Sequence, residues 1–284
     1  MKKKEKVINL VIYAFLILVL LITILPLLYT VFGSFKSNAE ILTHPERLIP
    51  SEPTLQNYLE AINSDEFNVL QMFWNSTYYS VLTVLITVTT ALATGYVFAR
   101  GGEFPGSKVI FAIFSSLMFV SLGGITIYPK FDVLRLFGLN DSLWGLIFMK
   151  IFAISIADIY IARGYIWSLP KELDEAAALD GCSFIGTFFR VILPLLKPVV
   201  ATLSILAFKG AWNEYLMPML FTLTRKDQRT LVAGIMAMKN AGESTTNWNI
   251  LLAGATVAML PILVIYAFCN KYFVQGIAAG AVKG

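Results

Sequence analysis

The stretch EAAALDG at residues 175–181 is followed, after nine residues, by VILP at residues 191–194. Alanine has the highest helix propensity, so the first stretch predicts a helix, and Gly181 predicts its end, in the left-handed conformation that glycine adopts after helices. The segment is polar and lies between two long apolar stretches. A membrane protein needs such a segment only where something soluble docks, so this region is the first candidate for a functional surface.

The composition indicates a polytopic membrane protein. Of 284 residues, 57% are hydrophobic and 14% are charged, whereas a soluble domain carries about 25% charged residues. The two cysteines give no disulfide framework, and the single histidine, His44, leaves a His-based metal site or catalytic triad unsupported. The net charge of +4 comes without a basic cluster interleaved with aromatics, so it does not indicate nucleic-acid binding.

The apolar runs predict an all-α fold with six transmembrane helices. The first run is long enough to cross a bilayer and is read as a retained helix kinked at Pro26. The expected spans are 7–35, 74–99, 109–128, 142–162, 198–222 and 250–270. Twelve Lys and Arg then fall on one side and eight on the other, the remaining two of 22 lying inside spans. This bias predicts cytoplasmic termini.

The outer loop, residues 36–68, is acidic, with six carboxylates against Lys36 and Arg47. Thr54 is expected to cap a short amphipathic helix lying on the outer surface, as a packing element or a docking site. The apolar face of that helix would be formed by Leu55, Tyr58, Leu59 and Ile62. The predicted organisation is a first helix with its loop (1–69), a core bundle (70–275) and a C-terminal tail (276–284).

The segment between 163 and 197 has the properties of a short rigid rod. Pro170 favours a helix start, and Glu172, Asp174 and Glu175 lie where the helix dipole favours carboxylates. A second helix would present Phe184, Phe188 and Ile192 on one face, with Pro194 and Pro198 bending it into the fifth span. The residues alone allow two interpretations, a partner-docking rod and an ordinary loop helix.

Polar side chains inside the spans form two groups. Six hydroxyl residues of the second span share one stripe, either for close helix packing or as a wall of a solute path; they are Ser76, Ser80, Thr83, Thr87, Thr90 and Thr94. Four ionisable residues fall in the fourth and fifth spans, namely Lys150, Asp158, Lys209 and Glu214. Charges at membrane depth are costly unless paired or hydrated. A Lys150–Glu214 pair is geometrically possible, and these charges either pair structurally or line a path beside Trp212, Asn213 and Tyr215.

The spacing of Glu175-Ala176-Ala177, Gly181 and Val191-Ile192-Leu193-Pro194 resembles the coupling motif of binding-protein-dependent ABC permeases, with valine at 191 in place of isoleucine. Further segments resemble the carbohydrate-importing, maltose-type second permeases. They are Pro53–Tyr58, Asn75-Ser76, Phe98–Arg100, Phe104–Gly106, Trp212–Tyr215 with Pro218, and the terminus from Gln275 to Gly284. The resemblance covers nearly the whole chain and implies a type I (MetI-like) permease fold in a prokaryotic plasma membrane.

The resemblance also implies roles for individual residues. ATPase coupling would involve Glu172, Glu175, Ala176, Ala177, Asp180, Gly181 and Pro194. The tail residues Gly280, Ala281, Val282, Lys283 and Gly284 would reach the ATPase. The substrate path would contain Lys150, Lys209, Trp212, Asn213, Glu214 and Tyr215.

The implied partners are a second homologous permease, two ATP-binding subunits, an extracellular solute-binding protein and a sugar, with membrane lipid around the bundle. No GxxxxGK[ST] loop is present, so ATP hydrolysis is expected in a partner, without a cofactor in this chain. The alternatives are a permease for peptides or amino acids, an ion-coupled carrier using Asp158 and Glu214, and a membrane enzyme. No internal repeat supports the carrier, and no polar catalytic constellation supports the enzyme.

Overall fold

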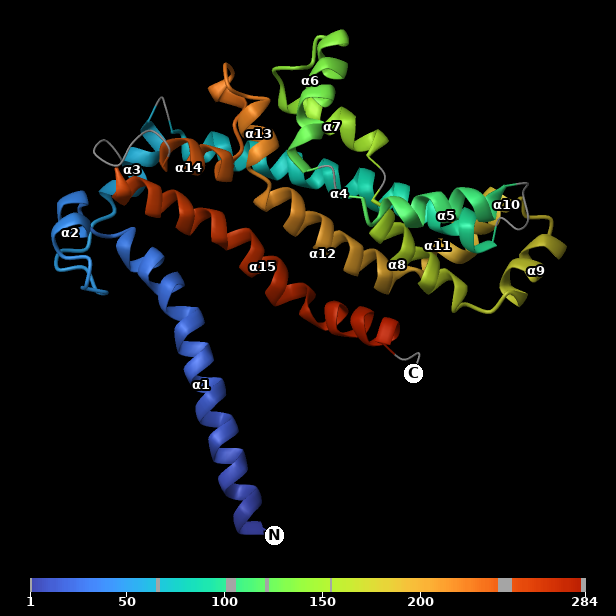
Figure 1. The fold of residues 1–284 in the computed structure, drawn as a ribbon, viewed down its shortest axis with the longest axis horizontal. Helices are drawn as coiled ribbons and strands as arrows, with labels where there is room; N and C mark the ends of the chain where they lie inside the picture. Colours follow the sequence, from blue (N-terminus) through green and yellow to red (C-terminus); the bar gives the residue numbers. More distant parts are fainter. Residues whose placement is uncertain are drawn as a thin grey trace. The chain divides into compact units, whose positions relative to one another are not determined.

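The computed structural model describes residues 2–64, 67–100, 106–120, 123–153, 155–239 and 247–281, with side chains described only from residue 5 to residue 268 within these ranges. The described segments are α-helices, short 3₁₀ and π turns, and connecting loops, with no strand among them (Figure 1). The predicted all-α class is confirmed.

Among the described residues, three helices are long and apolar enough to cross a membrane. They are α1 (Lys2–Gly33), α4 (Val69–Arg100) and α15 (Trp248–Ala281). The stretches that could span a membrane are Glu5–Gly33 of α1, the whole of α4 and Trp248–Phe268 of α15. These match the first, second and sixth predicted spans. Pro26 lies inside α1 and Pro261 inside α15.

The fourth and fifth predicted spans are interrupted rather than continuous. Helices α7 (Leu143–Phe152) and α8 (Ile156–Trp167) meet at 46°, because the backbone turns extended at Ala153 and Ser155. The stretch Phe184–Leu195 meets Lys197–Leu220 at 81°, and α12 (Lys197–Asn213) gives way to α13 (Leu216–Leu220) where Glu214 is extended. The bend expected at Pro194 and Pro198 is thus present, but the prediction of one unbroken helix over 198–222 was wrong.

The third predicted span, 109–128, is not a single helix. Helix α5 (Ser107–Leu117) has 11 residues, about 17 Å at ~1.5 Å per residue, against a hydrocarbon core of ~30 Å. The 3₁₀ turn η1 (Gly123–Thr126) and helix α6 (Ile127–Leu136) follow. The apolar composition of this stretch therefore did not predict where its first helix stops.

The chain divides into two compact units. Unit 1 comprises residues 1–71 and 234–260, and unit 2 comprises residues 72–233 and 261–284. Unit 1 holds α1, α2 (Asn38–Thr43), α3 (Gln56–Asn63) and the first part of α15. Helix α14 (Leu231–Lys239) continues from unit 2 into unit 1. The predicted boundaries at 69 and 275 stay predictions.

Buried residues gather at two places along α4 within unit 2. Towards the Arg100 end, Leu92 and Tyr96 pack with α8 and with the residues that lead into α12. Towards the other end, Tyr79 packs with α6, α7 and Phe221. Gly95 allows the close α4–α8 crossing, since a Cβ there would lie 2.8 Å from Ala162 Cβ. Helix α4 is therefore the element that both cores share.

The hydroxyl stripe of α4 supports the packing interpretation at one end. Ser76, Ser80 and Thr83 are buried, whereas Thr87, Thr90 and Thr94 are half-buried. Ser76 Oγ accepts a hydrogen bond of 2.8 Å from the backbone N–H of Leu231, at the start of α14. This bond joins two helices through a small hydroxyl side chain, as the packing interpretation of the stripe predicted.

Candidate functional site

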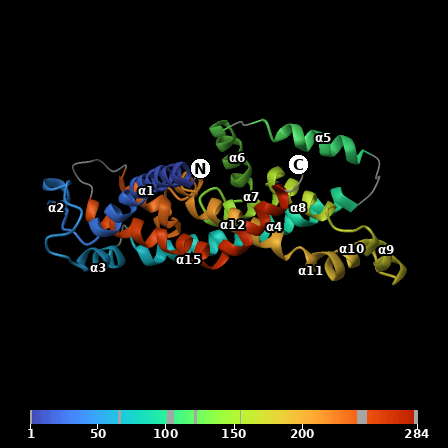
Figure 2. The ribbon, with the colours of Figure 1, turned by 90° about the horizontal axis from the view of Figure 1, so that it is seen from below.

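The segment that carries EAAALDG forms a helix–corner–helix. Helix α9 spans Glu172–Leu179, two residues later than the start expected from Pro170, and α10 spans Phe184–Thr187. In both views α9, α10 and α11 (Leu193–Leu195) lie together at one end of unit 2 (Figures 1 and 2).

Gly181 ends α9 in the left-handed region, with φ of 81°. Its N–H donates to Ala178 O at 3.0 Å, and the N–H of Cys182 donates to Ala177 O at 2.9 Å. This pair of bonds is the Schellman arrangement that satisfies the last carbonyl groups of a helix. Ser183 then caps α10, since its Oγ accepts from the N–H of Gly186 at 3.1 Å. The predicted glycine stop is confirmed.

Most predicted coupling residues lie on the exposed surface of this corner. Exposed positions are Glu172, Glu175, Ala176, Asp180, Gly181 and Pro194, and Ala177 is the exception, being buried. Leu179 is 90% exposed, and Ile185 and Phe189 are also exposed. The surface therefore combines apolar side chains with three carboxylates. On the inner side, Phe188 and Ile192 of the π-helical turn η2 (Phe188–Ile192) are buried as expected, whereas Phe184 is partly exposed.

The end of α4 holds α9 in place. Arg100 Nε lies 2.9 Å from Asp174 Oδ2, and the Arg100 side chain is 4% exposed. The same guanidinium donates to the carbonyl of Leu169 at 2.5 Å. Tyr96 O–H donates to Asp174 Oδ1 at 3.2 Å. No local pattern in the sequence predicted this contact, because Arg100 and Asp174 are remote from each other in the chain.

Tyr96 also joins α4 to the second helix of the corner. Its ring centroid lies 4.6 Å from that of Phe184 and 5.0 Å from that of Phe188. Aromatic pairs at these separations add to the free energy gained by area burial alone. One residue of α4 thus contacts both α9 and the α10–η2 segment.

An ionic cluster lies within the apolar part of unit 2. Lys150 Nζ of α7 lies 3.0 Å from Glu214 Oε2, and Tyr79 O–H of α4 donates to the same oxygen at 2.7 Å. Lys150 Nζ also lies 5.9 Å from the centroid of the Tyr79 ring. The predicted Lys150–Glu214 pair is confirmed. Tyr79 was not predicted to belong to this cluster. The feature of the sequence that could have indicated it is its position in the helix that carries the hydroxyl stripe.

The other predicted path residues do not join this cluster. Trp212 is buried, with its indole 5.5 Å from Phe208 and 5.6 Å from Phe73 between ring centroids. In this chain the indole therefore packs against other rings and does not offer an open face to a sugar. Lys209, Asn213 and Tyr215 are exposed, and Asn213 Nδ2 donates to Lys209 O at 2.9 Å. Asp158 is half-buried on α8.

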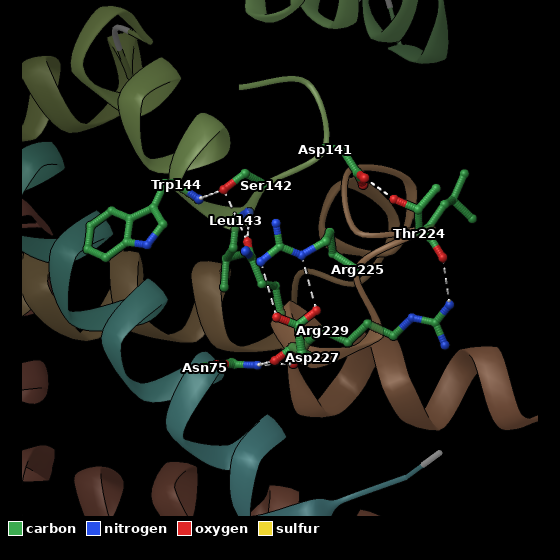
Figure 3. A network of polar contacts seen from close by, with 11 residues as sticks. Asn75, Asp141, Ser142, Leu143, Trp144, Thr224, Arg225, Asp227 and Arg229 are labelled. Atoms are coloured by element: carbon green, nitrogen blue, oxygen red, sulfur yellow. Dashed lines mark hydrogen bonds and ion pairs between the residues drawn. The ribbon is translucent and has the colours of Figure 1, made fainter. Parts of the chain in front are cut away.

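A polar network connects the start of α4 with the ends of the interrupted spans (Figure 3). Asn75 Nδ2 donates to the carbonyl groups of Asp227 and Arg229, at 2.8 and 2.9 Å. Gln228 Oε1 accepts from Ser142 Oγ and from the N–H of Leu143, at the first turn of α7. Helix ends leave N–H groups without intrahelical partners, and this network satisfies one of them.

Charged side chains on the surface of this network pair locally. The Arg225 guanidinium donates to both carboxylate oxygens of Asp227, at 3.2 and 3.3 Å, and these bonds lower the pKa of Asp227, whereas burial opposes the shift. Thr224 Oγ1 donates to the carboxylate of Asp141. The loop containing the 3₁₀ turn η3 (Lys226–Gln228) is thereby fixed to α4 and α7.

The predicted tail residues are only partly described. Gly280 and Ala281 are the last residues of α15. The helix therefore continues into the predicted tail, 276–284. Val282, Lys283 and Gly284 lie outside the described residues.

A family model and individual relatives indicate the same family. A family model described as "Binding-protein-dependent transport system inner membrane component" matches residues 92–279. The chain is 34% identical to the probable ABC transporter permease protein YurM of Bacillus subtilis (strain 168), over 96% of this chain and 88% of that protein. It is 30% identical to the arabinooligosaccharides transport system permease protein AraQ of the same organism, over 95% and 94%.

The fold also has a solved counterpart. A chain from the crystal structure of a bacterial ABC transporter involved in the import of the acidic polysaccharide alginate superimposes with a TM-score of 0.80. The match covers 95% of this chain and 98% of that chain, at 23% sequence identity. The type I permease fold implied by the coupling motif is thus confirmed.

Proposed function

This chain belongs to the family of inner membrane components of binding-protein-dependent transport systems, and from that premise we propose that it is one of two permease subunits in an ATP-driven importer of oligosaccharides. The observation that carries the proposal is the exposed α9–Gly181–α10 corner, anchored to the transmembrane helix α4. Support for the substrate class comes from AraQ and the alginate importer, whose names and titles refer to saccharides.

The corner is where the ATP-binding subunits dock. Exposed Leu179, Ile185 and Phe189 provide apolar contact area, which is the main favourable contribution to most protein association. Exposed Glu172, Glu175 and Asp180 offer carboxylates to basic residues of the partner. Ala176 leaves room for close approach beside them. The C-terminal segment, of which Gly280 and Ala281 end α15, is a second expected contact with the ATP-binding subunits, with both termini in the cytoplasm.

Helix α4 transmits movement from the corner to the solute path. The Arg100–Asp174 pair and the rings around Tyr96 fix the corner to one end of the helix. Tyr79, further along the same helix, holds Glu214. Tyr79 and Tyr96 are 17 residues apart in α4, which corresponds to about 26 Å at ~1.5 Å per residue. A displacement of the corner therefore acts on Glu214 and Lys150 through a continuous α-helix.

The solute path runs beside the ionic cluster. Lys150 and Glu214 contribute polar groups, and exposed Lys209, Asn213 and Tyr215 line the same route, with Trp212 fixing the α12–α13 break from within. A paired lysine and glutamate present hydrogen-bonding groups without net charge, which suits a hydroxyl-rich sugar. A second homologous permease provides the opposite wall, and an extracellular binding protein delivers the sugar.

The deciding experiment is uptake of labelled oligosaccharides by source cells with and without this chain. We expect loss of uptake for one class of oligosaccharide, and an equal loss after ATP depletion in the intact strain. Uptake that stops on addition of a protonophore while ATP is maintained would contradict ATP coupling and favour an ion-driven carrier. Unchanged oligosaccharide uptake with lost peptide or amino-acid uptake would overturn the substrate class alone.

A further inference from the structure

Helix α3 in unit 1 has three distinct faces. At about 100° per residue, positions four or three apart share a face. Asn57 and Ala61 are buried against the rest of the unit. The remaining surface divides into an exposed apolar row, made of Leu55, Leu59 and Ile62, and an exposed polar row, made of Gln56, Glu60 and Asn63. The two exposed rows lie side by side around the axis.

The orientation of α3 is the reverse of that in a soluble protein. A surface helix of a globular domain turns its apolar stripe inward, yet here Asn57 points inward while Leu55 and Leu59 are 65% and 53% exposed. Hydrogen bonds enforce this orientation. Asn57 Nδ2 donates to Ser34 O at 2.7 Å and to Lys36 O at 2.8 Å, and its Oδ1 accepts from Asn249 Nδ2 at 2.8 Å.

The same bonds fix the level of α3 relative to the membrane. Ser34 directly follows the last residue of the spanning helix α1, and Asn249 is the second residue of the spanning helix α15. Helix α3 therefore lies where two spans of unit 1 end (Figure 1).

Side chains typical of a membrane–water boundary surround this level. Tyr58 packs on Phe35 with ring centroids 5.6 Å apart and hydrogen-bonds Ser34 Oγ at 2.6 Å. The Nζ of Lys36 lies 5.7 Å from the centroid of the Tyr29 ring. Amphipathic aromatic rings concentrate at the headgroup level of bilayers. The position of α3 and the chemistry around it thus point to the same environment.

We propose that α3 is an interfacial helix whose apolar row, Leu55, Leu59 and Ile62, inserts between lipids at the boundary of headgroups and acyl chains. Glu60 and its polar row then face water, and the buried row holds α3 to the protein. Leu27 and Leu28, near the end of α1, are exposed apolar side chains as well. Lipid is favoured over a protein occupant because the row has no charged member and α3 is bonded to the ends of the two spanning helices α1 and α15.

The test places a nitroxide label on each row. The full chain, with Cys182 and Cys269 replaced by serine, carries Leu59→Cys or the matched neighbour Glu60→Cys and is reconstituted in phosphatidylcholine–phosphatidylglycerol vesicles. Collision with oxygen, which concentrates in lipid, is compared with collision with a water-soluble nickel chelate. We expect oxygen to dominate at position 59 and nickel at position 60, with the label at 59 about 5–10 Å below the headgroups.

Ile62→Cys repeats the measurement on the apolar row if the first variant does not fold, as judged by gel filtration. Equal access of nickel to positions 59 and 60 would overturn the proposal, because the row would then face water. Shielding of positions 59 and 62 from both oxygen and nickel would also overturn it, since a protein surface would then cover the row.

Discussion

Arg100, the last residue of α4, is ion-paired with Asp174, the third residue of α9, at 2.9 Å. The Arg100 side chain is almost completely shielded from water, being 4% exposed, and its guanidinium also donates to the carbonyl of Leu169. The first turn of α9 therefore cannot shift without moving the end of α4. This relationship leads directly to the first prediction.

Replacement of Arg100 by glutamine should uncouple ATP hydrolysis from transport. Removing one partner of a largely buried pair leaves the other charge uncompensated and costs about 3–5 kcal/mol. We expect uptake to fall strongly while the ATP-binding subunits still copurify with the permease, because the exposed surface of α9 is unchanged. The measurements are uptake, ATPase activity and copurification. The control is Lys108→Gln, which removes an exposed positive charge; equal effects of both variants would contradict the role of Arg100.

Gly181→Val should disrupt the corner through backbone conformation alone. The φ of Gly181 is 81°, and a Cβ there would meet no atom within 4 Å. The left-handed conformation costs a non-glycine residue about 1–2 kcal/mol, and a β-branched residue is the least tolerant. We expect weaker ATPase copurification and lower uptake for valine, and a milder loss for Gly181→Asn. Normal transport by the valine variant would show that the left-handed turn is dispensable.

The corner could be predicted from sequence because its determinants are local. Gly181, Ser183 and the alanine run act within one or two helical turns, and propensity and capping rules apply at that range. Arg100 could not be found in this way, because its partner is remote in the chain. Its pairing depends on the α4–α8 crossing that Gly95 permits, a property of packing rather than of any motif.

Replacing Lys150 or Glu214 alone should destabilise the protein more than replacing both. Among the described residues, Lys150→Met leaves Glu214 with the Tyr79 hydroxyl alone, and Glu214→Gln leaves the lysine charge without a counter-ion. Isolated charges within the membrane cost several kcal/mol, whereas the double variant buries no net charge. We expect the temperature of thermal unfolding in detergent to be lowered in each single variant and largely restored in the double variant. Additive losses would contradict a direct pair. Lys209→Met, at an exposed position, is the control for stability.

The intramembrane cluster was only partly predictable, for a related reason. The depth of Lys150 and Glu214 in their spans was readable from sequence, so their pairing could be expected. The side on which Trp212 lies was not, because it depends on the direction of the 81° bend that leads into α12, and no local pattern gives that direction. Continuous helices were assumed for both spans. Phe208 lies four residues before Trp212 on α12, so that contact follows the helical repeat, whereas Phe73 is recognisable as a partner only when α4 and α12 are already packed.

The loop containing Asp227 should lose order in acid. Hydrogen bonds from Arg225 hold the pKa of Asp227 below its ordinary value. A lowered pKa in the folded state means that the stabilisation is complete above the unfolded pKa and is lost as the pH falls through the folded pKa. We expect hydrogen exchange in residues 223–230 to rise below about pH 4, near the pKa of aspartate in an unfolded chain. Asp227→Asn should remove this pH dependence; an unchanged acid transition in that variant would assign it to another group.

Asn57 should be the single most important side chain for the order of the loop between α1 and α4. It is buried, and its amide makes three hydrogen bonds, to Ser34 O, Lys36 O and Asn249 Nδ2. Asn57→Ala leaves these partners unsatisfied, at about 1–3 kcal/mol for each buried polar group that finds no replacement. Asn63→Ala, on the exposed row of the same helix, removes the same amide from an exposed site and is the matched control. We expect faster hydrogen exchange across residues 36–63 in Asn57→Ala only. Similar exchange in the two variants would mean that contacts other than the Asn57 amide hold α3 against α1 and α15.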